Sequence, residues 1–126
     1  KSLNILKANG NVKIEDTLQN YYLFSESINY EKNKEIIRSN GNSKALYDGS
    51  REIKADNFEY FKMLNILNAN GNVEIEDRNQ DIKIYAQDIS YEIDKGKIYT
   101  KGSTKSDIQS KYFFQSNHIH KYQLIC

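Results

Sequence analysis

The residues that could do chemistry in this chain are two acidic pairs, two histidines and one cysteine. Glu15-Asp16 and Glu76-Asp77 each place two carboxylates together, and a pair of carboxylates supplies the acid and base of most glycoside hydrolases. Both pairs fall at the same position of an internal repeat, whereas a catalytic site normally breaks the symmetry of a repeat. We therefore assign them turn and surface roles and expect no catalytic residue and no enzymatic activity.

The two histidines have a spacing that suits metal ligation. His118 and His120 are two residues apart and would share one face of a strand. No cysteine and no column of carboxylates lies beside them, so we interpret them as a solvent-facing pair opposite an inward Ile119. We expect no metal and no cofactor. Cys126 is the only cysteine, which excludes an internal disulfide framework.

Length and composition limit the class of protein. The chain has 126 residues, one domain's worth, and its 18 basic and 17 acidic residues give no field that would gather nucleic acid. It has no apolar run long enough for a helical membrane span. No signal peptide is visible and the first residue is Lys1, so we expect a fragment of a longer protein. Ten tyrosines and no proline favour strands over disorder.

An internal repeat organises these residues. Leu3–Asp16 and Leu64–Asp77 align without a gap, 61 positions apart, and differ at two of fourteen positions. A half-period is also visible, because glycines recur roughly every 30 residues at Gly10, Gly41, Gly71 and Gly102. Apolar or small side chains alternate at a spacing of two around each glycine, which is the period of a β-strand.

These spacings predict an all-β fold, a twisted β-jelly roll or solenoid-like stack of short antiparallel strands with about four repeats of roughly 30 residues. Each repeat should hold three or four short strands. Apolar side chains keep the same spacing of two on both sides of each Asn-Gly, which favours a bend inside a strand over a hairpin turn. The spacing of three from Ser25 to Ile28 predicts a bulge or a tight corner in the strand. Arg51 and Lys121 fall in apolar columns, so they should lie at an open edge or seam.

The recurring phrase Ala-Asn-Gly-Asn-Val-x-Ile-x-Asp, followed by a small residue and Ile/Phe-x-Tyr, resembles the OstA-like family. This family comprises the periplasmic lipopolysaccharide-transport proteins LptA and LptC and the N-terminal domain of LptD. Ala55–Tyr60 and Ala86–Tyr91 match its "small, polar, polar, apolar, x, Tyr" pattern. The resemblance runs from about Leu3 to about Lys121 and is nearest to the LptD domain, so residues 1–126 are expected to form one OstA-like domain.

The resemblance implies a non-catalytic domain that binds and transports lipopolysaccharide. Its apolar interior would hold the acyl chains of lipid A, and its edge strands would stack on other OstA-like domains in a periplasmic bridge to the outer membrane of a Gram-negative bacterium. An outer-membrane barrel would follow in the same chain if it is an LptD, and Cys126 would then be a candidate for a disulfide to that barrel. The residues expected to line the lipid groove are Leu23, Ile28, Tyr30, Phe58, Tyr60, Ile84, Ile89, Tyr91 and Ile98.

Two other hypotheses remain open. A β-solenoid scaffold that assembles end to end without binding lipid would have a closed, packed interior. A carbohydrate-active β-helix enzyme would need outward carboxylates clustered in neighbouring repeats, and only the symmetric acidic pairs are present. Tyr22, Phe24 and Tyr85 are expected to face outward, where they are open to a partner surface.

Overall fold

The computed structural model describes residues 5–17, 20–102, 104–108, 112–116 and 122–123. His118, Ile119, His120, Lys121 and Cys126 lie outside these ranges. All regular structure within them is β-strand, which confirms the predicted fold class. The strands are β1 (Ile5–Asp16), β2 (Tyr21–Glu31), β3 (Ile36–Tyr47), β4 (Arg51–Phe61), β5 (Ile66–Asp77), β6 (Ile82–Glu92), β7 (Lys97–Lys101), β8 (Thr104–Ile108), β9 (Tyr112–Ser116) and β10 (Tyr122–Gln123).

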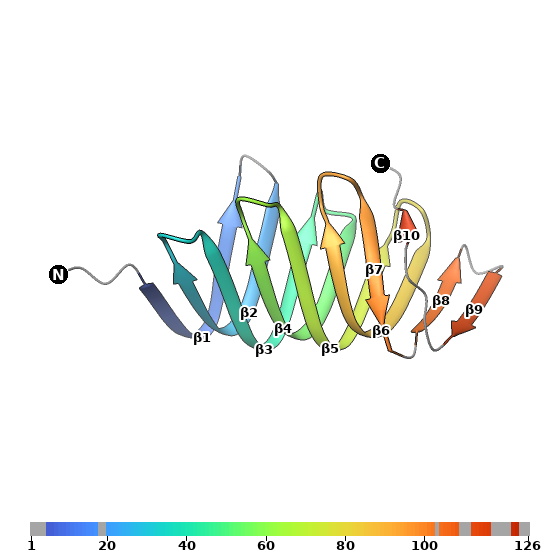
Figure 1. Ribbon diagram of the computed structural model, residues 1–126, viewed down its shortest axis with the longest axis horizontal. Helices are drawn as coiled ribbons and strands as arrows, with labels where there is room; N and C mark the ends of the chain where they lie inside the picture. Colours follow the sequence, from blue (N-terminus) through green and yellow to red (C-terminus); the bar gives the residue numbers. More distant parts are fainter. Residues whose placement is uncertain (1–4, 18–19, 103, 109–111, 117–121, 124–126) are drawn as a thin grey trace.

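The strands form one antiparallel sheet in which β1 to β7 follow each other in chain order (Figure 1). Beyond β6 the sheet divides, because β6 pairs with both β7 and β8, β8 pairs with β9, and β7 pairs with β10. Each of the first three repeats therefore contains two long strands of 11 or 12 residues, where the sequence predicted three or four short ones. Short strands occur only in the described part of the fourth repeat.

The long strands β1, β3 and β5 bend at their Asn-Gly-Asn sequences. In β3, Gly41 and Asn42 both have positive φ angles, 88° and 44°, and the register with β4 shifts between Asn40 and Ser43. Two residues of β3 then face one residue of β4, which is a β-bulge. The same shift occurs at the equivalent glycines of β1 and β5. The prediction of a bend inside the strand is confirmed. A bulge does occur opposite the spacing of Ser25 and Ile28, but its extra residue belongs to the neighbouring Asn-Gly-Asn strands and not to β2, where it was predicted.

The bends lie in register along the sheet, so the sheet folds along them into two layers (Figure 1). We name the layer that ends in the turns 48–50 and 78–81 arm A. The layer that ends in the turns 32–35, 62–65 and 93–96 is arm B. In Figure 1 the bends run along the lower edge and both sets of turns along the upper edge. One long strand thus contributes half of its length to each arm.

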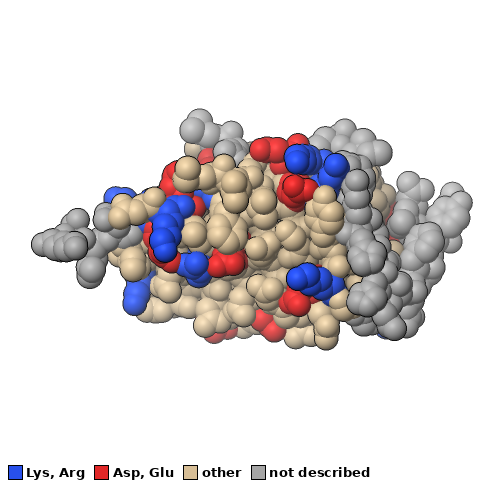
Figure 2. Space-filling view, viewed as in Figure 1, with Lys and Arg blue, Asp and Glu red and all other residues tan. Residues whose placement is uncertain are grey.

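The core lies between the inner faces of the two arms. Because side chains alternate across a strand, each arm turns one row of residues inward from every strand. In arm A, Ile53, Ile75 and Ile84 are neighbours in register and each is at most 1% exposed. In arm B, Phe58 and Leu67 belong to the facing layer and are as deeply buried. The outer face of the sheet carries acidic and basic groups side by side, and neither sign dominates the view in Figure 2.

Candidate functional site

An apolar cavity of about 490 Å³ opens at the β1 end of the folded sheet. Within the described residues β1 pairs only with β2, so its inward side chains have no further strand beside them. The volume lies within the range of about 300–1,000 Å³ that is typical of ligand sites. The apolar residues that line it are Leu6, Ala8, Val12, Ile14, Tyr21, Ile28, Tyr30 and Ile37, and the polar ones are Lys7, Glu15, Asp16, Thr17 and Lys62.

The internal repeat shows why this end is open. Leu6 of β1 is 59% exposed, whereas Leu67, its counterpart 61 residues later in β5, is 1% exposed. Ala8, Val12 and Ile14 are likewise exposed or half-buried, while their counterparts in β5 are fully buried. The same sequence is therefore core in the middle of the sheet and cavity wall at its end. The β1 end presents a cross-section of the hydrophobic core.

The nine residues predicted to line a lipid groove all lie on the inner faces of the arms or beside them. Eight are buried at 4% exposure or less, and Tyr30 is half-buried against the core. Only Ile28 and Tyr30 line the end cavity. The other seven pack between the arms as part of the core cluster. Contact of any of them with a lipid stays a prediction.

Four tyrosines close the upper side of the fold between the two rows of turns; we call them the tyrosine seam. Tyr21 stacks on Tyr47 within arm A, with ring centroids 5.2 Å apart. Across the fold, Tyr21 meets Tyr60 edge to face at 5.6 Å, and Tyr47 meets Tyr91 in the same way at 6.0 Å. Burial raises the pKa of Tyr47 well above its usual value, and burial also raises the pKa values of Tyr21 and Tyr60.

A buried ion pair continues the tyrosine seam. Arg51 Nε donates to Asp77 Oδ2 at 2.9 Å, and the same guanidinium donates to the Tyr91 hydroxyl at 3.1 Å. Arg51 was predicted to lie at an open edge or seam, but it is buried at 8% exposure on β4, an inner strand of the sheet, where Asp77 neutralises it. Asp77 also accepts the backbone N–H groups of Asn79 and Gln80, so its turn role is confirmed. Its predicted surface role is wrong, because Asp77 is 1% exposed and neutralises Arg51.

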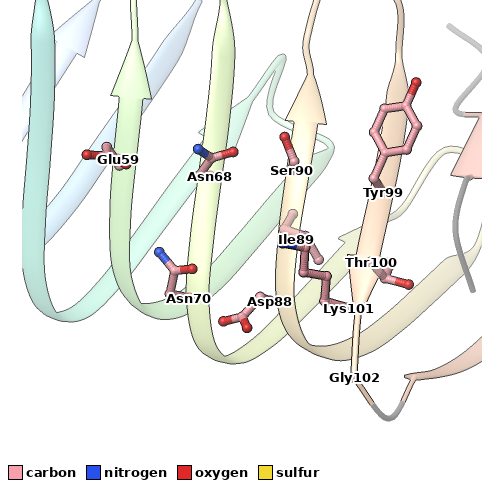
Figure 3. Close-up of a pocket in the computed structure, with 10 residues that line it drawn as sticks. All are labelled: Glu59, Asn68, Asn70, Asp88, Ile89, Ser90, Tyr99, Thr100, Lys101 and Gly102. Atoms are coloured by element: carbon pink, nitrogen blue, oxygen red, sulfur yellow. The ribbon is translucent and has the colours of Figure 1, made fainter. Parts of the chain in front are cut away.

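A second hollow, of about 790 Å³, lies on the outer face of arm B and is polar. Figure 3 shows its side chains in two rows that run across β4 to β7. Strand register creates both rows: Glu59, Asn68, Ser90 and Tyr99 pair in one, and Asn70, Asp88 and Lys101 in the other. These amide, hydroxyl and charged groups could form hydrogen bonds with a polar ligand. No pattern along the sequence indicated them, because the members of each row come from different strands.

A cluster of lysines and aromatic rings lies on the outer face of arm A. The ammonium of Lys13 sits over the rings of Tyr22 and Phe24, at 4.8 and 5.7 Å from their centroids, and Lys44 sits over Phe24 at 5.3 Å. Tyr22 and Phe24 are only partly buried, so both contribute to the outer surface as predicted. The cluster could attract an anionic group through its lysines. It was missed from the sequence because three different strands supply its members.

Metal ligands and membrane spans were also sought in the described residues. No group of three or more histidine, cysteine, aspartate or glutamate side chains is placed there to hold a metal ion. No helix in the same ranges is long and apolar enough to cross a membrane.

The fold defines a class of protein, a repeat protein made from one antiparallel sheet that is folded along its glycine bends, with an apolar cavity at one end. Comparison of the sequence with protein-family models and with curated proteins finds no match.

Proposed function

We propose that this chain is a non-catalytic, OstA-like domain that binds lipopolysaccharide and passes it along the periplasmic bridge to the outer membrane. The proposal assigns the end cavity to the acyl chains and the free edge of β1 to a neighbouring OstA-like domain. The observation that carries it is the exposure of Leu6, whose repeat counterpart Leu67 is core. Apolar surface of this kind is stabilised when an acyl chain or another apolar group covers it.

The character of the cavity supports an apolar ligand. Its wall is mainly aliphatic and aromatic, with Val12, Ile28 and Ile37 among the lining residues. Charged groups lie among the lining residues too, including Lys62 and Asp16. A ligand with apolar chains and a polar head matches this combination, because the chains would contact the core cross-section while the head stayed in water.

The edge of β1 supports stacking. An unpaired strand presents free backbone donors and acceptors to an added strand. Lipid binding and stacking would use neighbouring parts of the same end. A neighbouring domain placed there would continue the apolar interior, so that the acyl chains could move from one domain to the next.

Binding is tested by Leu6→Asp, with Ile5→Asp as the matched control. The two residues are adjacent in β1, both are exposed (59% and 45%), and successive side chains point to opposite faces of a strand. Only Leu6 lines the cavity. Purified chain is titrated with lipopolysaccharide in a fluorescent acyl-probe displacement assay. We expect Leu6→Asp to weaken binding by about tenfold or more, since it places a charge against acyl chains, and Ile5→Asp to leave it unchanged. Equal effects of the two substitutions would contradict the assignment.

A scaffold that assembles end to end without lipid is the second candidate. The observation that favours it is the packing between the arms, where Ile53, Ile75 and Ile84 are at most 1% exposed. The acyl-probe displacement assay separates the two, because end-to-end assembly in sedimentation velocity is expected of both. The scaffold predicts no probe displacement by lipopolysaccharide.

A further inference from the structure

An apolar patch lies on the outer side of arm B, at the end where its turns are. Ile36, Phe61 and Ile66 pair side by side in register on β3, β4 and β5, and all three point outward and are half-buried. Met63 and Leu64 extend them into the turn between β4 and β5, where they are 74% and 67% exposed. We call these five residues the rim patch. Contiguous apolar surface of this kind usually marks an interaction site.

The turn that carries Met63 and Leu64 is held in place by its neighbours. Lys62 N donates to Glu35 O at 3.0 Å, and Ile93 N donates to Asn65 O at 3.1 Å, so the three turns of arm B are tied into one row. The Tyr60 hydroxyl also donates to Asn65 Oδ1 at 2.8 Å. The tip is thus a fixed feature, and its two apolar side chains are presented to solvent by a supported backbone.

The turns around this tip carry more basic than acidic residues, and Glu31 and Glu92 flank the rim patch on β2 and β6. The turns 32–35, 62–65 and 93–96 carry Lys32, Lys34, Lys62 and Lys95, against two acids, Glu35 and Asp94. The described residues of the turns of arm A carry one arginine against Asp48 and Asp81. The side chains of Lys34 and Lys95 are 70% and 64% exposed even while they pair with glutamates. The apolar tip therefore protrudes from the more basic of the two rims.

We infer that the rim patch docks this domain on an anionic lipid surface, with Met63 and Leu64 inserted below the headgroups and the lysines among them. A protruding apolar tip with long basic side chains beside it is the arrangement that binds such surfaces, since lysine stems snorkel toward the headgroups. A protein partner fits less well, because lysine is depleted in protein interfaces. The inference does not depend on the lipid assigned to the cavity.

Docking would also place the end cavity close to the lipid. Lys62 belongs to the same turn as Met63 and Leu64, lines the cavity, and has its ammonium 5.8 Å from the centre of the Tyr30 ring. A lipid surface in contact with this turn would therefore lie beside the mouth of the cavity. The contact would shorten the path of an acyl chain between a membrane and the cavity.

The chain contains no tryptophan, which allows a clean test with single-tryptophan variants. Leu64→Trp reports on the tip, and Tyr85→Trp reports on an exposed position of arm A, where Tyr85 is 41% exposed. Each variant is mixed with phosphatidylcholine vesicles, with or without about 30% phosphatidylglycerol, which supplies the anionic surface. We expect the emission of Leu64→Trp to shift to the blue only with anionic vesicles and to be quenched by brominated acyl chains. Tyr85→Trp should not change.

Vesicle sedimentation then measures the contribution of the patch. The double substitution Met63→Asp and Leu64→Asp should weaken binding to anionic vesicles by about tenfold or more, since it removes the inserted apolar groups. Tyr85→Asp should leave it unchanged. Three results would overturn the inference: no binding to anionic vesicles, equal binding to neutral ones, or a blue shift of Leu64→Trp with protein concentration alone, which would indicate a second copy on the patch. Leu6→Asp should still dock, so a failure of the cavity assignment would be seen separately.

Discussion

The buried ion pair between Arg51 and Asp77 gives the sharpest prediction about stability. Asp77→Asn keeps an oxygen that can accept from the following turn but removes the charge that faces Arg51. The side chains of Arg51 and Asp77 are only 10% and 1% exposed, so solvent screens the pair weakly. Loss of one partner from such a pair costs about 3–5 kcal/mol, because the remaining charge stays buried and uncompensated. That is a large share of the ~5–15 kcal/mol that stabilises a typical domain.

Urea unfolding followed by circular dichroism measures this loss. With a slope of about 1–3 kcal/mol per molar urea, the midpoint of Asp77→Asn should fall by roughly 1–5 M. Asp16→Asn is the matched control: it changes the repeat counterpart of Asp77, on the open side of the sheet, and should cost less than about 1 kcal/mol. Adding Arg51→Met to Asp77→Asn should recover at least about half of the loss, since no unpaired charge remains. The reasoning is refuted if Asp77→Asn costs no more than Asp16→Asn, or if the double variant is as unstable as Asp77→Asn alone.

Two further predictions concern the bends and the tyrosine seam. Gly71→Ala should destabilise the fold by about 2–3 kcal/mol, because φ is +84° and a Cβ would lie 2.3 Å from Asp56 Oδ2. Gly10→Ala is the control: Gly10 also has a positive φ, but open space surrounds it, so the substitution should cost only about 1–2 kcal/mol. Equal losses in urea unfolding would contradict this. The Tyr47 hydroxyl has no hydrogen-bond partner among the described residues, and burial raises its pKa. The contribution of Tyr47 to stability is therefore complete below the pKa of about 10 that a tyrosine has in the unfolded chain, and it is lost as the pH rises above that value. Tyr47→Phe should therefore be as stable as the wild type at neutral pH and lose stability less steeply above about pH 10, and an unchanged alkaline slope would argue against it.

The local features of the fold could be predicted from the sequence because they depend on neighbouring residues. The spacing of two between apolar side chains predicts the strands. The alternation of side chains continues across Gly41, which predicts a bend inside the strand, and the positive φ angles of Gly41 and Asn42 confirm it. The number of strands in each repeat was wrong. In β3 the backbone ladder continues on both sides of the bend with a single bulge, so the two halves of a bend belong to one strand.

The features of the candidate site depend on which strands lie beside each other, and the sequence does not contain that directly. Leu6 and Leu67 have almost identical neighbours in the chain, yet one is a cavity wall and the other is core. Local sequence cannot separate them, since the difference is the presence of a further strand. The same applies to Asp77, whose buried role comes from Arg51 on the adjacent strand, 26 residues away.

Occupation of the apolar end cavity by acyl chains can be measured most directly by site-specific photo-crosslinking to lipopolysaccharide. A photoreactive residue is placed at Tyr30, which lines the cavity, or at Asn29, its exposed neighbour on β2. The two positions lie on opposite faces of one strand, so they differ mainly in the side they report. We predict capture of lipopolysaccharide at Tyr30 and none at Asn29. Capture at Asn29 alone, equal capture at both positions, or no capture at Tyr30 would contradict this prediction.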